Sequence, residues 1–171
     1  MILNITCGDR RWFAETNSEI SDAVAEALGS LRSGHVRDGY WRPGVNAWFS
    51  WSDRRHLDRP DVPNNFLVVS LNRETGYGGL IWFVNDGYPG PDPDEVLDNI
   101  WVSDNLNPPD FDTEVVAEPG EPYFFDPRST LPITKIEAAV DEFCRTRTGI
   151  RPECVHWTLG EASGKRADRD M

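Results

Sequence analysis

The alternation of apolar and polar positions along the chain predicts two helices. In residues 16–34 apolar side chains recur every three or four positions, the spacing of a helix with one buried face. Thr16 and Glu19 have the spacing of a capping box, which predicts where this helix begins. Residues 131–149 show a second apolar stripe, and Gly149 is the type of residue that ends a helix.

Shorter apolar runs predict strands between and after these helices. The link NRETGYG at residues 72–78 contains the glycines that a hairpin connection needs. Trp48 and Trp51 lie three positions apart on one run, so they are expected to face opposite sides of the sheet. The runs are MILNIT (1–6), NAWFSWS (46–52), FLVVSL (66–71), GLIWFV (79–84), NIWVS (99–103) and ECVHWTL (153–159).

These elements predict an α+β fold, with a mainly antiparallel sheet of about five to seven strands and two principal helices packed on it. The chain has 171 residues, which is enough for one domain with its own hydrophobic core. We expect residues 1–160 to form this single domain. Residues 161–171 are polar, and we expect them to be a flexible tail.

The composition indicates a cytoplasmic protein that does not enter a membrane. No apolar run is long enough to span a bilayer, and the first residues lack the pattern of a signal peptide. The three cysteines, Cys7, Cys144 and Cys154, are odd in number and lack the C-x-x-C spacing. This argues against a disulfide framework and favours a reducing compartment.

The negative charge is concentrated in one part of the sequence. The net charge is −12, and the segment from Glu74 to Pro127 holds 13 acidic residues and no Lys or Arg. Nucleic acid is excluded as a partner of such a surface, because phosphates require a basic one. The segment either keeps the protein soluble or binds a basic protein. Prolines that hold much of it extended are found at positions 108, 109, 119, 122 and 127.

No catalytic or metal-binding set emerges from the sequence. Cys154 and His156 could share one face of a strand, but two ligands are too few for a structural zinc site. The stretch DGYPGPDPDE at 86–95 is rich in carboxylates but lacks the spacing and central glycine of an EF-hand loop. A nucleophile beside a histidine and an orienting acid is also not indicated. We therefore assign no catalytic residue, no metal and no cofactor.

The aromatic residues allow two interpretations. Trp82 lies within an apolar run and is expected to be a core residue. Trp41 lies in a turn-like context and Trp101 leads into the acidic stretch, so each is either a core residue or an interface anchor.

The C-terminal half resembles the Imm1 family of bacterial immunity proteins. The resemblance lies in the entry DPRSTLP (126–132), the helix EAAVDEFCRT (137–146) and the exit TGIRPECVHW (148–157), and it covers roughly residues 65–160. It implies a small α+β protein that is not an enzyme, encoded beside a polymorphic toxin, often one with a nucleic-acid deaminase fold. The residue types at the motif positions indicate a mainly structural role. These positions are Leu131, Pro132, Phe143, Gly149, Arg151, Pro152 and Trp157.

The charge and the resemblance together predict a cognate toxin domain as the partner. A toxin that acts on nucleic acid presents a basic groove, and an acidic surface can occupy that groove in place of the substrate. We expect acidic side chains and one aromatic anchor to form the contact surface. The predicted contact residues are Asp92, Asp94, Glu95, Asp98, Trp101, Asp104, Asp110 and Asp112.

Two other functions remain open at this level. Exposed tryptophans beside carboxylates could form a module that binds carbohydrate or another small ligand. Two carboxylates that the sequence does not mark could also act together in a hydrolase.

Overall fold

The computed structural model describes residues 1–57, 65–84, 88, 90–97 and 99–168. The helices are α1 (Asn17–Ser30), α2 (Pro93–Val96) and α3 (Ile133–Thr146), with a single 3-10 turn at Pro127–Ser129. The strands are β1 (Ile2–Cys7), β2 (Arg10–Ala14), β3 (His35–Arg37), β4 (Tyr40–Arg42), β5 (Ala47–Ser52), β6 (Asn65–Asn72), β7 (Tyr77–Val84), β8 (Ile100–Asp104), β9 (Val116–Glu118), β10 (Tyr123–Phe124), β11 (Thr130–Pro132) and β12 (His156–Gly160).

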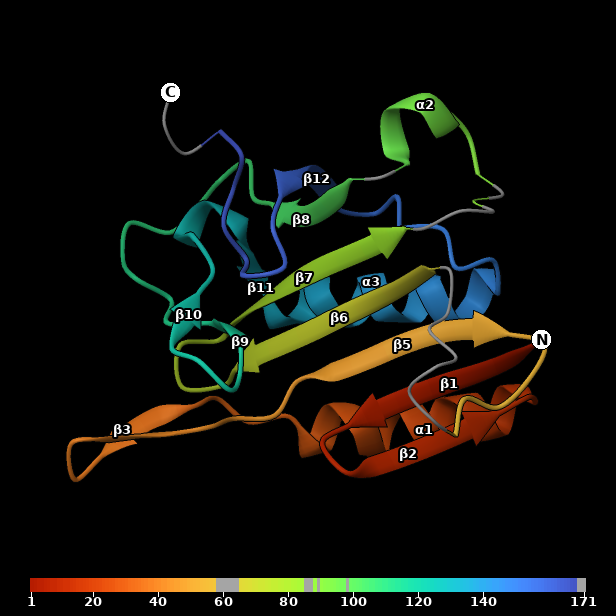
Figure 1. Cartoon of the computed structure of the whole chain (residues 1–171), viewed down its shortest axis with the longest axis horizontal. Helices are drawn as coiled ribbons and strands as arrows, with labels where there is room; N and C mark the ends of the chain where they lie inside the picture. The colour runs from red at the N-terminus through yellow and green to blue at the C-terminus, as the bar shows by residue number, and fades with distance from the viewer. Residues whose placement is uncertain (58–64, 85–87, 89, 98, 169–171) are drawn as a thin grey trace.

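An antiparallel sheet forms the centre of the fold (Figure 1). Its strands follow the order β12-β8-β7-β6-β5-β1-β2, and β11 pairs with the first part of β7. The pairs β3–β4 and β9–β10 form two small separate ribbons. The predicted α+β class is therefore confirmed. The apolar pattern missed one strand of the main sheet near the N-terminus, β2. It was missed because its sequence begins with two arginines.

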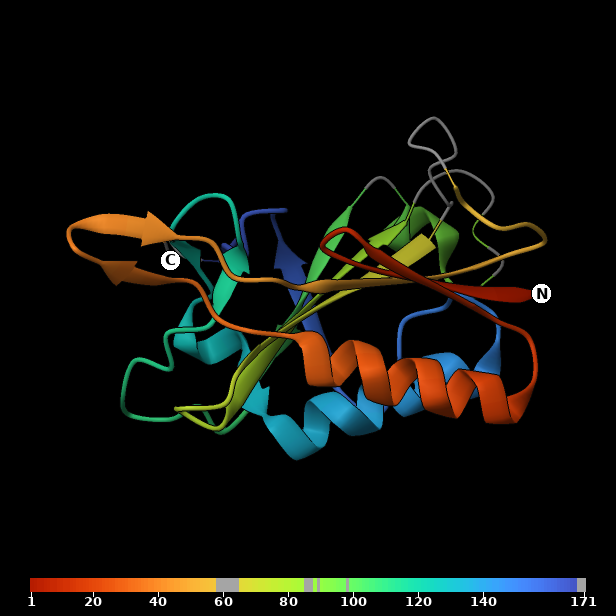
Figure 2. The same cartoon turned by 90° about the horizontal axis from the view of Figure 1, so that it is seen from below.

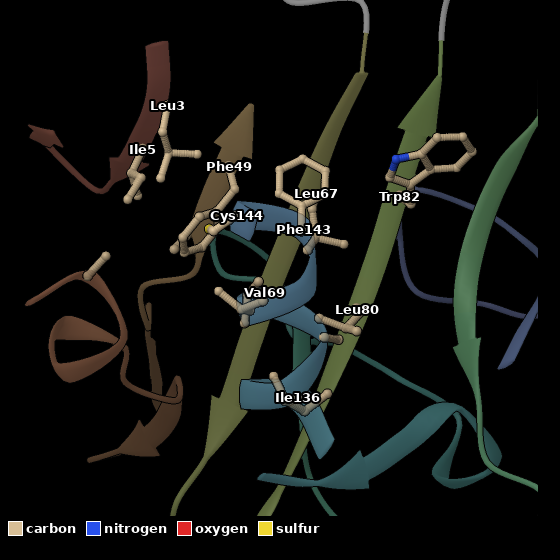
Figure 3. Close-up of a cluster of buried hydrophobic side chains, with 14 of the residues drawn as sticks. Leu3, Ile5, Phe49, Leu67, Val69, Leu80, Trp82, Ile136, Phe143 and Cys144 are labelled. Atoms are coloured by element: carbon tan, nitrogen blue, oxygen red, sulfur yellow. The ribbon is translucent and has the colours of Figure 1, made fainter. Parts of the chain in front are cut away.

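Helices α1 and α3 cover one face of the sheet (Figure 2). The strand alternation turns Leu67 and Val69 of β6 toward the helices, where they pack with Phe143 of α3 (Figure 3). The same alternation separates the two tryptophans of β5 as expected. Trp51 lies on the helix side and is 7 % exposed, whereas Trp48 lies on the other face and is 44 % exposed.

The opposite face of the sheet has a smaller core that the Pro-rich acidic segment covers in part. Phe66, Val68, Ile81 and Val102 of the sheet pack against Val115, Ala117 and Phe125 from that segment. The segment is thus not a free excursion, because three of its apolar residues are buried against the sheet. Within the segment, Val116–Glu118 pairs with Tyr123–Phe124 as the β9–β10 ribbon.

The capping box of α1 is confirmed and carries a testable stability effect. Thr16 Oγ1 accepts a hydrogen bond from the Glu19 amide at 3.2 Å, and Glu19 Oε2 accepts one from the Thr16 amide at 3.1 Å. We expect Thr16→Ala to lower the free energy of unfolding by about 1 kcal/mol, because an amide of the first turn loses its acceptor. Urea denaturation followed by circular dichroism measures this. Ser18→Ala, at an exposed helical position, is the control, and an equal loss there would contradict a capping effect.

The junction between α3 and β12 gives the exit motif a structural role. The Gly149 carbonyl accepts hydrogen bonds from Trp82 Nε1 at 3.0 Å and from Asn65 Nδ2 at 3.3 Å, both from buried side chains of the sheet. The Pro152 carbonyl accepts one from Trp157 Nε1 at 2.8 Å. The motif therefore connects the end of α3 to the sheet through these hydrogen bonds.

The segment after β12 is packed, contrary to the flexible tail that its polarity predicts. Residues 161–165 form a turn, and Arg166 pairs back with Gly160. Arg166 is 7 % exposed, and its guanidinium donates to Asp104 Oδ1 at 2.6 Å and to Asp168 Oδ1 at 2.8 Å. The tail prediction is wrong for these residues, because the buried guanidinium gains charged partners that local sequence does not reveal. Residues 169–171 lie outside the described residues.

Candidate partner-binding site

The predicted acidic contact residues do not form one surface, because β8 divides them. Helix α2 comes before β8, with Asp92 at its N-cap and Asp94 and Glu95 in its first turn. The loop with Asp110 and Asp112 follows β8. Figures 1 and 2 both show α2 and this loop at opposite ends of the sheet. All five of these side chains are exposed. Asp98 lies outside the described residues.

Trp101 is not an exposed anchor, and this part of the prediction is wrong. Its side chain is 6 % exposed and belongs to the core on the helix side of the sheet. The indole Nε1 donates to the Val96 carbonyl at 3.4 Å, and the Arg151 guanidinium lies 4.3 Å from the ring centroid. Trp101 is buried because successive residues of β8 point to opposite faces of the sheet, and each face carries a hydrophobic core.

Asp104 has a structural partner instead of a free charge. It is half-buried, and Arg166 lies within 2.6 Å of its carboxylate. A carboxylate held by a buried guanidinium stabilises the chain and offers little attraction to a basic partner. Asp104 is therefore better assigned to the fold than to the contact surface.

Asp110 and Asp112 belong to a larger acidic group at their end of the molecule. Asp112 Oδ1 accepts a hydrogen bond from the Glu114 amide at 2.9 Å, which fixes the local turn. Glu114, Glu118 and Glu121 are exposed on the same loop and on the β9–β10 ribbon. Sequence reasoning left these glutamates out, although they lie in the same segment that lacks any basic residue.

Exposed apolar side chains gather at this same end. Ten large apolar side chains of the described residues are exposed, and six of them belong to the β3–β4 hairpin, the loop between β8 and β9, or β10. Figures 1 and 2 both show these three elements at one end of the molecule. The six are Val36, Tyr40, Leu106, Phe111, Tyr123 and Phe124.

We call this region the end surface, meaning these six apolar residues together with Asp110, Asp112, Glu114, Glu118 and Glu121. Exposed apolar patches on a folded domain include sites of contact with proteins, membranes and ligands. Aromatic anchors surrounded by charged residues also match the anatomy of protein interfaces. The sequence signal that could have found it is the series of aromatics inside the acidic segment at Phe111, Tyr123 and Phe124.

A groove of about 540 Å³ opens at the end surface, beside the β3–β4 hairpin. It is lined by the apolar residues Val36, Trp41 and Phe124 and by both acidic and basic residues. The acidic and basic residues are Glu74, Glu114, Arg32, Arg73 and His35. Trp41 is half-buried, with its ring edge-to-face on Phe124 at 6.1 Å between centroids. Trp41 is thus part of the site as a wall of the groove.

The described residues offer no activated nucleophile and no metal cluster. No group of three or more His, Cys, Asp or Glu side chains among them could hold a metal ion. Desolvation, followed by a hydrogen bond to Glu142, raises the pKa of the Cys154 thiol to about 11. Burial raises the pKa of the Cys144 thiol to about 12. Thiols of this kind stay protonated at neutral pH and are poor nucleophiles. Cys154 also precedes β12, so it does not share a strand with His156.

A sugar-binding platform is also poorly supported. Trp48 is the one exposed tryptophan among the described residues. One face of its ring is covered by Phe66, with 5.0 Å between centroids and 17° between planes, and Phe66 stacks in turn on Phe83 at 4.5 Å. The three rings form a row across β5, β6 and β7 on the face of the sheet opposite the helices.

The fold is an α+β domain whose end surface combines exposed apolar and acidic side chains. The family model described as "Immunity protein Imm1" matches residues 8–159, and the chain belongs to that family. The match confirms the resemblance and extends it from the C-terminal half back to β2 and α1. Membership implies an immunity protein that acts against a toxin. No curated protein and no solved structure shows a significant match to the chain. No helix among the described residues is long and apolar enough to cross a membrane.

Proposed function

We propose that this protein neutralises its toxin by covering the toxin's substrate groove with the end surface. The toxin is a domain that acts on nucleic acid, of the deaminase type that the family resemblance implies. The protein acts as a binding partner and not as an enzyme, in the cytoplasm. The observation that carries the proposal is the coincidence of five exposed carboxylates and six exposed apolar side chains at one end of an otherwise well-packed fold.

The physical basis is competition for a basic surface. An enzyme that binds DNA or RNA needs cationic residues along its groove, because the phosphate backbone dominates affinity. The carboxylates of the end surface attract the same residues and steer the two proteins together, which raises the association rate at low salt. The apolar side chains then supply the buried anchors that hold a complex together. For a deaminase, blocking entry of the base is sufficient, and no contact with its zinc ion is required.

Two groups of exposed carboxylates, one at each end of the sheet, allow a matched test. One triple variant, Asp110→Asn, Asp112→Asn and Glu121→Gln, removes three charges from the end surface. The other triple variant, Asp92→Asn, Asp94→Asn and Glu95→Gln, removes three charges at α2. Each triple changes two aspartates and one glutamate. Both keep the shape of each side chain. After Asp112→Asn, the amide oxygen at position 112 can still accept the hydrogen bond from the Glu114 backbone N–H.

We expect only the end-surface triple to weaken binding, by about tenfold at low salt, with most of the loss in the association rate. The measurement is calorimetric and kinetic titration with the toxin domain encoded beside this protein, at low and high salt, with the toxin's activity assayed in parallel. Loss of binding in the α2 triple alone would place the interface at the other end of the sheet and overturn the proposal. Tight wild-type binding that does not change with salt would keep the immunity function and reject the electrostatic mechanism.

A further inference from the structure

The β3–β4 hairpin projects from the body of the protein as a short arm (Figure 1). Asp38 and Gly39 at its tip have φ values of 53° and 78°, the left-handed pair that makes a tight two-residue turn. Val36 lies directly opposite Trp41 in the ribbon, so both side chains share one face, and both line the groove. The other face carries Tyr40 and basic side chains into solvent. The arm therefore presents its apolar face to the groove.

The arm is held in position even though a two-stranded ribbon has little stability alone. Trp41 Nε1 donates to the Pro119 carbonyl at 3.0 Å, and its ring packs on Phe124. Gly34 permits this arrangement, because a β-carbon there would lie 2.3 Å from the Trp41 ring. The groove wall is thus preformed, which lowers the entropy lost when a partner binds.

Two glutamates, Glu74 and Glu114, line the groove near the β6–β7 turn, and Arg32 and Arg73 also line it. The buried side chain of Asn72 holds the two glutamates together, since its Oδ1 accepts from the Glu74 amide at 3.1 Å and its Nδ2 donates to the Glu114 carbonyl at 3.0 Å. Both glutamate side chains are exposed and form no ion pair within the described residues. The nearby Arg73 guanidinium donates to the Leu31 carbonyl at 2.7 Å, so its hydrogen bonds are directed at the end of α1.

We propose that this groove receives a segment of the toxin in which a large apolar side chain stands next to an arginine or lysine. The apolar side chain lies against Val36, Trp41 and Phe124, and the cation pairs with Glu74 and Glu114. The volume of about 540 Å³ lies within the range of roughly 300 to 1,000 Å³ of pockets that bury a ligand. The proposal rests on the proposed function for the identity of the partner, and it adds the chemistry of the segment that the partner inserts.

Two single variants test the two halves of this recognition with the same toxin domain. Val36→Asp places a charge on the apolar wall, and Glu74→Lys reverses an acidic charge that lines the groove. Val36 is 68 % exposed and Glu74 is exposed, so neither change disturbs the core, and unfolding midpoints verify this. Leu159→Asp on β12 and Glu95→Lys on α2 make the same chemical changes at exposed positions elsewhere. We expect each groove variant to weaken toxin binding at least about tenfold and each control less than about threefold.

Photocrosslinking identifies the inserted segment directly. The photoreactive residue p-benzoylphenylalanine is placed at position 36 or, as a control, at position 159, and the crosslinked toxin peptide is sequenced by mass spectrometry. We expect a crosslink from position 36 to a peptide with a basic residue within two positions of a large apolar one. If the wild type binds the toxin and both groove variants bind it with unchanged affinity, the groove assignment is overturned while the proposed function stands. A crosslink to an acidic peptide would have the same meaning. Absence of wild-type binding would instead overturn the proposed function.

Discussion

Replacing Trp82 with alanine is expected to lower the free energy of unfolding by about 3–5 kcal/mol, the range for removing a fully buried aromatic side chain. Trp82 is 0 % exposed at the centre of β7. Its loss would leave a cavity under α3 and would also leave the Gly149 carbonyl without one of its two side-chain donors. Urea denaturation followed by circular dichroism and by tryptophan fluorescence measures the change.

Trp48→Ala is the matched control, because it removes the same side chain from the neighbouring part of the sheet. Trp48 is 44 % exposed and packs mainly on Phe66, so its loss should cost only about 1 kcal/mol. Trp82→Phe keeps most of the buried area while it removes the hydrogen bond to Gly149. An equal cost for the two alanine variants would show that the core does not depend on Trp82.

The second large effect is expected at Arg166. Replacing it with methionine should lower the free energy of unfolding by about 2–3 kcal/mol at neutral pH, less than the full cost of breaking a buried ion pair. That full cost is about 3–5 kcal/mol, but both carboxylate partners keep part of their solvent contact. The side chains of Asp104 and Asp168 are 22 % and 31 % exposed, whereas that of Arg166 is 6 % exposed. Denaturation of the wild type and the variant at pH 7 measures the difference.

The pH dependence of the same variant tests the electrostatic origin of this effect. Hydrogen bonds from Arg166 lower the pKa of the Asp168 carboxyl from its ordinary value of 3.8. A carboxyl whose pKa is lower in the folded protein adds stability above its unfolded pKa, and this stability is lost as the pH falls through the folded pKa. The difference between wild type and Arg166→Met should therefore shrink as the pH falls below 3.8 toward the folded pKa of Asp168. A constant difference would indicate a packing effect of the side chain instead.

The acidic segment shows why a pattern of charge in the sequence does not define a surface. Thirteen acids in one run suggested one contact surface, but β8 lies within the run. The carboxylates at α2 and those of Asp110 and Asp112 therefore lie at opposite ends of the sheet (Figure 1). Within the run, Trp101 is buried and Asp104 is paired with a residue 62 positions away. The exposed part that combines charge with apolar contact area consists of the loop after β8 and the β9–β10 ribbon.

Local interactions explain what could be predicted from sequence alone. The α+β class, the two long helices, the capping box and the principal β6–β7 hairpin follow from periodicity and from contacts within a few residues, which the sequence displays directly. The opposite orientations of Trp48 and Trp51 follow from strand alternation in the same way. The motif that carries the family resemblance was recognisable because its residues join α3 to the sheet over a short stretch of chain.

Tertiary structure alone decided which polar and aromatic residues became available for function. The groove needs the hairpin at residues 35–42, the turn after β6 and the ribbon near residue 124 to meet, and none of these is close to the others in sequence. The burial of Arg166 depends on a carboxylate supplied by β8. Such contacts arise from how strands are ordered in the sheet, and strand order is set by packing energies summed over the whole chain. The sequence by itself determined the elements and the excess of negative charge, and the ordering of the strands determined where that charge meets exposed apolar surface.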